Sequence, residues 1–458
     1  MYGKKKKAMK WATTTKKLAF RKFVPWRRVG SSDKDALYAM DSRNCNCLDG
    51  IIRMGVGVKV HTNSSGQVVK YTISDAEVDC FFFAHKHLES GEYKPMLCCL
   101  AKSGAYYFTY FDSTNFIEYL DAQLQDIKQV DSFLTADNEP YVVFFGGFGV
   151  CMAQLDTWER AEILTSVQCG CVWNDRVYAV IDPYTLLYSA PLEPMDFSDT
   201  IHNSGRIYIS RDTGNGVAMK PLNGKLYLFS DYGITEIEPA GSAKDFKQKK
   251  IAYQGGRIVP GTVGECQGRL YFFALDGVYA FDGHCAEKKF RKLNLKGKDA
   301  TQKGGFAACN NGFLLRYCDE KNVFRTVYLD PQKDSGYKTM DCCALSMADG
   351  RAICGRNKMA YYIDEGASLP IGESAVFQSE PVNFGTKERK LLSYVRLTGE
   401  GTAALIIFTE NRSVAYGLNF SEGAVSIRPN LCGKEFQFKI SLNVGGSVSG
   451  LELEADCL

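Results

Sequence analysis

Short apolar runs separated by polar turns recur along most of the chain. The three clearest copies consist of a polar turn, a basic residue and an apolar strand: residues 174–180 (NDRVYAV), 223–229 (NGKLYLF) and 267–273 (QGRLYFF). A second apolar run follows two of them, at residues 234–237 and 278–281, after a turn that contains glycine. Apolar runs on both sides of such a turn are typical of β-hairpins. The pattern therefore predicts antiparallel strand pairs.

The spacing of the copies predicts how these hairpins are arranged. Weaker copies begin near Ser103, Asn138, Asn311 and Asp349, so successive copies are 35, 36, 49, 44, 44 and 38 residues apart. Each interval accommodates a four-stranded sheet, and a closed ring of such sheets protects most strand edges. We expect an all-β fold with a β-propeller of about seven blades, with six or eight also compatible, over residues 61–371. A large β-sandwich is the alternative.

A different pattern follows after Ile371, where the repeated copies stop. The expected strands are residues 393–398, 404–409, 436–442 and 448–453. The last two alternate between apolar and polar positions, which is typical of a sheet that buries one face. We therefore expect residues 372–458 to form a small C-terminal β-sandwich. Residues 29–60 are expected to lead into the first blade or to pair with this C-terminal sheet.

The net charge of +3 conceals an uneven distribution of charge along the chain. The first 28 residues contain 11 basic and no acidic residues, so the other 430 carry 55 − 11 = 44 basic against 52 acidic residues, a net of −8. We treat residues 1–28 as a basic N-terminal arm. Its basic and tryptophan residues are Lys4, Lys5, Lys6, Lys7, Lys10, Trp11, Lys16, Lys17, Arg21, Lys22, Trp26, Arg27 and Arg28.

Three interpretations of this arm remain open. A block of like charges is often a solvated tail, but it also suits contact with an acidic partner or with DNA. Large aromatic residues such as Trp11 and Trp26 favour a segment that covers some surface. The hypothesis that we carry forward is a partner-binding arm.

The 17 cysteines are spread along the chain, and their spacing does not match a zinc knuckle. No C-x-x-C pair occurs, and most cysteines lie within apolar runs. Buried thiols that act as small apolar groups in a reducing compartment explain this distribution. Metal and disulfide roles are the alternatives.

Few residues form a pattern that indicates catalysis. His85 and His87 alternate as a metal pair on a strand does, but no third ligand is evident nearby. Residues 212–216 (DTGNG) resemble the start of a calcium loop without its later acidic residue, so we interpret them as a turn. Phosphate-binding, dinucleotide-binding and serine-hydrolase motifs are absent from the sequence. We predict neither a catalytic residue nor a metal or other cofactor, although a glycosidase needs only two carboxylates and stays possible.

Three patches carry a resemblance to a known family. They are residues 172–234, which include VWNDRVYA, LYSAPLEPMDF, GRIYI and VAMKPLNGKLYLF; residues 39–50 (AMDSRNCNCLDG); and residues 381–397, which include PVNFG and KLLSYVRL. Together they resemble the nozzle, or tail tubular, and packaged-DNA stabilisation proteins of short-tailed phages. The resemblance covers roughly residues 35–458.

The resemblance implies a non-enzymatic structural protein of a phage or prophage tail, assembled in the bacterial host cytoplasm. Such proteins form rings, often hexameric, that extend the DNA conduit below the portal and adaptor. Viral double-stranded DNA passes through the lumen, and fibres or distal tail proteins attach outside. The arm is then expected to dock on an adjacent ring, so that deletion of residues 1–28 leaves a folded protein that fails to join the tail. Alternatives are a propeller hydrolase acting on surface glycans and a protein-binding scaffold.

Overall fold

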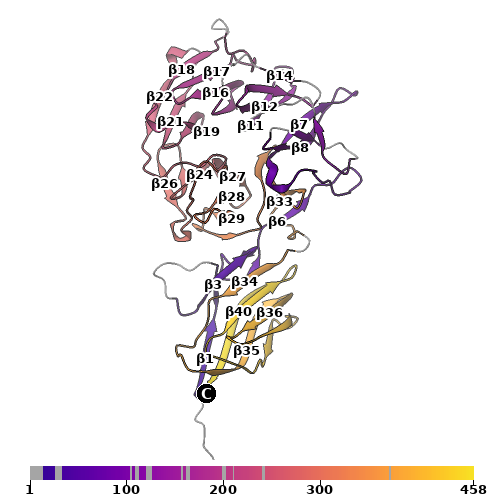
Figure 1. Cartoon of the computed structure of the whole chain (residues 1–458), viewed down its shortest axis with the longest axis vertical. Helices are drawn as coiled ribbons and strands as arrows, with labels where there is room; N and C mark the ends of the chain where they lie inside the picture. Colours follow the sequence, from indigo (N-terminus) through magenta and orange to yellow (C-terminus); the bar gives the residue numbers. More distant parts are fainter. Residues whose placement is uncertain are drawn as a thin grey trace, which may run out of the picture. The chain divides into compact units, whose positions relative to one another are not determined.

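The computed structural model describes most of the chain as β-strands joined by turns (Figure 1). The described residues are 14–25, 33–103, 106–108, 113–119, 126–155, 158–160, 166–198, 203–209, 211–239, 243–370 and 373–458. The all-β prediction is confirmed. Within these ranges, no helix has the length and apolar character needed to cross a membrane.

The chain divides into two compact units. The first, which we call the propeller unit, comprises residues 58–335 and 341–365. The second, the sandwich unit, comprises the described parts of residues 1–57 together with residues 336–340 and 366–458. The propeller is therefore an insertion between segments that belong to the sandwich.

Seven four-stranded antiparallel sheets of described residues form the propeller, in agreement with the predicted number of blades; Gly57 and residues 336–338, which cluster with the sandwich unit, belong to strands of these sheets. The first three sheets comprise β7 (Val78–His87), β8 (Tyr93–Ala101), β9 (Tyr106–Phe108) and β10 (Ile117–Tyr119); β11 (Ile127–Leu134), β12 (Pro140–Gly146), β13 (Gly149–Ala153) and β14 (Trp158–Arg160); and β15 (Cys169–Trp173), β16 (Arg176–Asp182), β17 (Thr185–Tyr188) and β18 (Gly205–Tyr208). The next three comprise β19 (Gly216–Leu222), β20 (Lys225–Ser230), β21 (Gly233–Glu238) and β22 (Lys247–Ile251); β23 (Gly264–Cys266), β24 (Arg269–Ala274), β25 (Gly277–Phe281) and β26 (Ala286–Lys289); and β27 (Gly305–Ala308), β28 (Phe313–Cys318), β29 (Phe324–Asp330) and β30 (Ser335–Lys338).

The seventh sheet closes the ring with a strand from the other end of the propeller sequence. Its strands are, in order, β31 (Leu345–Ala348), β32 (Arg351–Arg356), β33 (Met359–Asp364) and β6 (Gly57–Val60). The next residue continues this pairing, because the His61 amide donates to the Ala360 carbonyl over 2.8 Å. Closure therefore joins residues about 300 positions apart in sequence.

The repeated sequence marker is the turn between the first and second strands of a sheet, except near Ser103, where it lies between the second and third strands, β8 and β9. Asn223 and Gly224 connect β19 to β20 with φ values of 50° and 75°, and Gln267 and Gly268 connect β23 to β24 with 53° and 74°. Two consecutive positive φ angles define the tight hairpin turn whose twist matches the flanking strands. A Cβ atom on Gly224 would meet nothing within 4 Å, so the backbone angle, not the space, favours glycine there.

Aromatic side chains fill the spaces between neighbouring sheets. The rings of Phe229 and Phe272 lie 5.3 Å apart across the β19–β22 and β23–β26 sheets, and those of Phe82 and Phe144 lie 5.2 Å apart across the first two. All four side chains are buried. Burial of this apolar surface is the main term that holds the sheets together.

The sandwich unit consists of two sheets around one apolar core. One contains β1 (Thr15–Phe20), β41 (Ser447–Cys457), β35 (Lys390–Glu400) and β38 (Ala424–Ile427), with β39 (Leu431–Gly433) also paired to β35. The other contains β2 (Lys22–Val24), β3 (Ala36–Arg43), β34 (Ala375–Ser379), β40 (Gln437–Leu442), β36 (Thr402–Phe408) and β37 (Ser413–Asn419). A short separate pair is formed by β4 (Cys45–Asn46) and β5 (Arg53–Met54).

N-terminal strands complete both sheets of the sandwich. β1 runs antiparallel to β41 with Thr15 opposite Asp456, and β3 runs antiparallel to β34 with Ala39 opposite Ser379. Phe20 and Phe23 are buried in the shared core. The expectation that residues 1–28 can be removed without harm to the fold therefore needs correction, because residues 15–24 supply two strands and two core aromatics.

Candidate functional site

The candidate site lies on the end of the propeller that carries the connections between sheets. In a four-stranded antiparallel sheet, the turn between the second and third strands lies at the same end as the connection that leaves the fourth. The β20–β21 and β24–β25 turns therefore share this end with the connections at residues 252–263 and 290–304. We call this surface the connection face.

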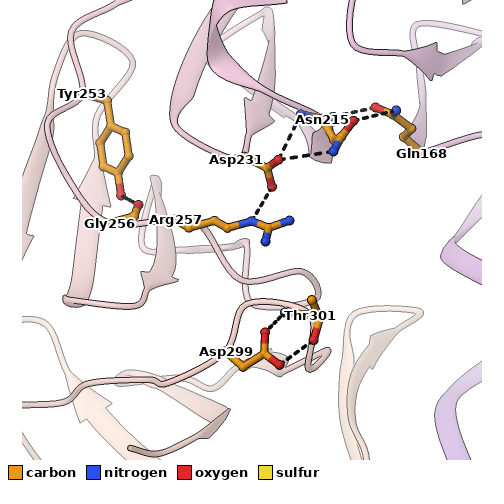
Figure 2. Close-up of polar contacts among 9 residues, drawn as sticks. Gln168, Asn215, Asp231, Tyr253, Gly256, Arg257, Asp299 and Thr301 are labelled. Carbon is orange, nitrogen blue, oxygen red and sulfur yellow. Dashed lines mark hydrogen bonds and ion pairs between the residues drawn. The ribbon is translucent and has the colours of Figure 1, made fainter.

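Asp231, in the β20–β21 turn, is the centre of a polar network on the connection face (Figure 2). Its Oδ1 accepts a hydrogen bond from Arg257 Nε at 2.9 Å, and its Oδ2 accepts one from the Asn215 amide at 3.1 Å. Asp231 is buried, whereas about a third of the Arg257 side chain is exposed. The hydrogen bond to Asp231 raises the pKa of Arg257.

The network extends to the preceding sheet through two amide side chains. Gln168 Nε2 donates to Asn215 Oδ1 over 3.2 Å, and Gln168 Oε1 accepts from the Gly216 amide over 2.7 Å. Gln168 precedes β15, while Asn215 and Gly216 lie at the start of β19. These bonds, drawn in Figure 2, connect the first strands of two neighbouring sheets.

Asp276 lies in the corresponding turn of the next sheet, between β24 and β25, one position later in its turn than Asp231. It accepts hydrogen bonds from the Gly256 amide at 2.7 Å, the Tyr279 hydroxyl at 2.6 Å and Lys288 Nζ at 2.8 Å. Partial burial alone would raise the pKa of Asp276, but the bonds from Lys288, Tyr279 and Gly256 outweigh it and lower that pKa. The side chain is therefore held as a carboxylate.

Asp299 adds a third carboxylate, on the β26–β27 connection (Figure 2). The amide and hydroxyl of Thr301 donate to it over 2.8 and 2.7 Å. These bonds, with attraction from Arg257 and Lys298, lower the pKa of Asp299. The connection face thus combines fixed carboxylates with a partly exposed guanidinium, an arrangement suited to binding polar groups of a partner.

The predicted arm residues that the structure describes all lie in the sandwich unit. Lys16 Nζ donates to the Phe384 carbonyl over 3.2 Å, Lys17 pairs with Glu454 at 2.5 Å and Lys22 pairs with Asp33 at 3.5 Å. Arg21 is exposed between β1 and β2. The other predicted residues, Lys4, Lys5, Lys6, Lys7, Lys10, Trp11, Trp26, Arg27 and Arg28, lie outside the described residues.

The other sequence candidates have local roles. His85 lies in β7, and burial lowers its pKa; His87 ends the same strand with its ring 4.9 Å from that of Tyr93. Among the described residues, no group of three or more His, Cys, Asp and Glu side chains is arranged to hold a metal ion. Residues 211–213 form a 3-10 turn that leads into Asn215, and Asn215 is the residue of the DTGNG segment that bonds to Asp231.

All 17 cysteines lie in the described residues, and all are free thiols. Most are buried, and only Cys285 is exposed. Burial raises the pKa of Cys169 and Cys80, the latter to about 12. The interpretation of most cysteines as small buried apolar groups agrees with these environments.

No sequence motif marks Asp231, Arg257 or Asp276 as candidate site residues. Asp231 and Asp276 lie in the glycine-containing turns that follow two of the repeated strands. An aspartate in the turn between the second and third strands of two successive repeats is the sequence signal that could have identified them. Arg257 lies in a connection with no repeated pattern, so its partner becomes evident only from the fold.

Comparison with known proteins identified solved structures with a similar fold and no related family. No protein-family model matches the chain, and no curated protein sequence matches it. Solved structures with a similar fold include the WD40 repeats of RRP9, 10% identical with a TM-score of 0.40, covering 67% of this chain and 99% of that one. The computationally designed Ika8 protein is 10% identical with a TM-score of 0.39, covering 65% and 98%. PorZ, a component of the type-IX secretion system of Porphyromonas gingivalis, is 10% identical with a TM-score of 0.39, covering 77% and 46%.

Proposed function

We propose that this protein is a structural component of a phage or prophage tail, where it forms an oligomeric ring and binds neighbouring tail proteins. The observation that carries the proposal concerns the three patches of family resemblance. Ala39, Phe384 and Val395, from patches about 340 residues apart, belong to one buried cluster. The remaining patch, residues 172–234, runs from the end of β15 to the start of β21 in two consecutive propeller sheets. Two of the three patches thus pack together in the core of the sandwich unit.

In the proposed ring, the propeller of each subunit acts as a scaffold that binds other tail proteins. Arg257 and the exposed Tyr232, both on the connection face, are the residue types that anchor protein interfaces. Hydrogen bonds among Gln168, Asn215 and Asp231 brace the loops below them. In this proposal, neighbouring tail proteins contact the connection face, and viral DNA passes through the lumen of the assembled ring.

The carboxylates that line a pocket beside β26 favour a structural role over hydrolysis. Asp276 and Glu287 both line this pocket. Asp276 forms an ion pair with Lys288, and Glu287 forms one with Lys289, each at 2.8 Å. The pKa of each carboxyl is lowered. A glycosidase requires a general acid with a raised pKa, so this pair is tuned in the opposite direction.

Light scattering on size-exclusion fractions, followed by negative-stain electron microscopy, tests the proposal. The expected result is a ring of several 50.9 kDa subunits, alone or after addition of the proteins encoded by adjacent genes. Portal, terminase and capsid genes are expected beside this one. A persistent monomer with no affinity for those neighbours, or turnover of a surface glycan, would contradict the proposal.

The role of the arm requires a shorter deletion than residues 1–28. Removal of residues 1–13 leaves β1 and β2 intact and removes Trp11 and five of the lysines. If the arm docks on an adjacent ring, this truncated protein folds normally and fails to enter the tail. Normal incorporation of the truncated protein would exclude docking through these residues.

A further inference from the structure

One segment of the propeller, from the outer strand of one sheet to the connection after the next sheet, carries a concentration of basic residues that the total charge hides. Residues 243–298, which run from β22 to the connection after β26, contain 12 basic and five acidic residues, a net charge of +7. The whole chain has +3, so the rest carries 3 − 7 = −4. The body of the protein is therefore not uniformly acidic. We call the surface formed by β22, β26 and residues 290–298 the basic rim.

Edge protection does not explain this concentration. The fourth strand of a sheet has an unpaired edge, and a single lysine is a common device against pairing with other chains. β22 contains three lysines and β26 contains two, whereas the other outer strands contain at most one basic residue each: β10, β14, β18, β30 and β6. The first four residues of β22, Lys-Gln-Lys-Lys, are all exposed.

A pocket of about 620 Å³ lies beside β26 and has an excess of positive charge. Its charged lining residues are Lys288, Lys289, Arg291, Lys296, Asp276 and Glu287. Asp276 pairs with Lys288 and Glu287 pairs with Lys289, so the two carboxylates leave Arg291 and Lys296 as the positive excess. Arg291 uses Nε to donate to the Lys288 carbonyl at 3.2 Å, and its side chain is exposed.

The turn that presents Arg291 is firmly anchored and locally strained. Phe290 and Asn294 flank a 3-10 helix, residues 291–293, and both have left-handed backbone angles, with φ of 53° and 48°. Such an angle is rare for a bulky residue and usually marks a position that the surrounding structure enforces. The Phe290 ring is buried 6.0 Å from that of Phe313, and its amide donates to Asp334 at 2.7 Å. The anchored Phe290 thus fixes the backbone of the turn that carries the exposed Arg291.

Glycine at position 277 keeps the pocket lysine in place. Gly277 has φ of 151°, and a Cβ atom there would lie 2.7 Å from Lys288 Cε. Any larger residue would therefore displace Lys288 from its contacts with Asp276 and the Tyr279 ring. The pocket wall depends on this close approach.

We propose that the basic rim binds the phosphate backbone of a nucleic acid. Lysine and arginine that neutralise phosphates supply most of the non-specific affinity for nucleic acid. Protein interfaces, in contrast, are depleted in lysine and centre on aromatic or apolar anchors. The exposed part of β22 contains lysine and glutamine without an apolar side chain, which favours nucleic acid over an acidic protein. This inference is independent of ring assembly, because it concerns the rim of a single subunit.

Fluorescence anisotropy with labelled 20-nucleotide single-stranded and duplex DNA, at about 50 mM salt and above, tests this inference. The rim variant is Lys249→Gln/Arg291→Gln/Lys296→Gln, and the matched control, Lys102→Gln/Lys321→Gln/Lys358→Gln, removes three exposed lysines elsewhere on the propeller. We expect the wild type and the control to bind DNA with affinity that falls steeply with salt. The rim variant should bind at least about tenfold more weakly, with a salt slope shallower by about one per lost contact.

Three results would overturn the inference. They are no DNA binding by the wild type at low salt, equal loss of affinity in the rim and control variants, and tighter binding of polyglutamate than of DNA. The last would assign the rim to an acidic protein partner. Circular dichroism and thermal unfolding of each variant verify that the fold is unchanged, and the control variant separates a local effect from loss of total charge.

Discussion

Arg257 and Asp231 form a 2.9 Å ion pair that joins the outgoing connection of one propeller sheet to an internal turn of the same sheet. The same turn is fixed at its backbone, because the Asp231 amide donates to Asn215 and its carbonyl accepts from Ile258. Asp231, in the β20–β21 turn, thus bonds both to Asn215 just before β19 and to the connection that follows β22.

Replacement of Asp231 should destabilise the propeller. Asp231→Ala leaves the Asn215 amide and the Arg257 guanidinium without their acceptor, and such orphaned groups cost about 1–3 kcal/mol. Chemical denaturation measures the loss, and a double-mutant cycle with Arg257→Ala measures the coupling.

The matched control for this loss is Asp212→Ala. Asp212 pairs with Lys250 at 3.0 Å, but both side chains are more than half exposed. Exposed pairs contribute about 0–1 kcal/mol, so the two alanine variants should differ clearly. Equal stability of Asp231→Ala and Asp212→Ala would show that the network does not support the fold.

Truncation should have a threshold between residues 13 and 25. A protein that lacks residues 1–13 retains β1, β2 and their core contacts, and its midpoint of thermal unfolding should match that of the full chain. Removal of residues 1–25 deletes Phe20 and Phe23 and uncovers β41 and β3, so the sandwich should unfold at a lower temperature or fail to fold.

The single substitution Phe23→Ala isolates the packing part of this effect. Phe23 is fully buried, with its ring 5.4 Å from that of Phe377. Its truncation should cost about 3–5 kcal/mol. Unchanged unfolding after removal of residues 1–25 would contradict the assignment of these strands to the sandwich.

Acid should weaken the propeller through His61. Burial lowers the pKa of His61 to about 4, while an unfolded histidine titrates near about 6.5. Between these values the unfolded chain binds the proton first, so stability is complete above about pH 6.5 and falls as the pH drops toward 4. The shift corresponds to a loss of about 3 kcal/mol by pH 4.

His61→Gln should flatten this pH profile. Glutamine keeps a polar group near the Tyr362 hydroxyl, which lies 3.0 Å from His61 Nδ1, and it does not titrate. Denaturant unfolding at pH 7.5, 5.5 and 4.5 gives the difference from the wild type, with the exposed His284→Gln as control. An identical pH dependence in the wild type and His61→Gln would exclude this contribution.

One thiol should react much faster than the rest. Cys285 is exposed, whereas burial raises the pKa of Cys309 and Cys343 to about 12 and leaves little thiolate at neutral pH. DTNB should therefore label about one thiol rapidly in the native protein and all 17 after denaturation. Cys285→Ser should remove the fast phase, and several fast thiols in that variant would contradict the described burial.

Local patterns were sufficient to predict much of the fold. The Asn-Gly and Gln-Gly turns identified the repeated hairpins because a tight turn leaves its signature in two adjacent residues. Alternation in β40 and β41 predicted the sandwich because one face of each strand is buried. Both signals lie within a few residues of chain.

Features that depend on distant partners were not predictable in this way. In β1, lysines 16 and 17 dominate the composition, so the segment resembled a charged arm, although Phe20 enters the core. β6 gives no local sign that it pairs with β33. The Asp231–Arg257 pair joins a turn to a connection 26 residues later, and no helical or strand period relates the two. Such relationships arise from topology.

The pairing of β6 with β33 has a consequence for synthesis on the ribosome. β6 emerges early but cannot complete its sheet until residues 359–364 have also emerged, and β1 waits longer still for residues 447–457. Contacts between such distant segments are formed slowly, and unpaired strand edges in the meantime promote aggregation. The nascent chain therefore reaches its closed form only after almost all of it has been translated, and a translation arrest before residue 359 leaves an open ring with an unprotected edge.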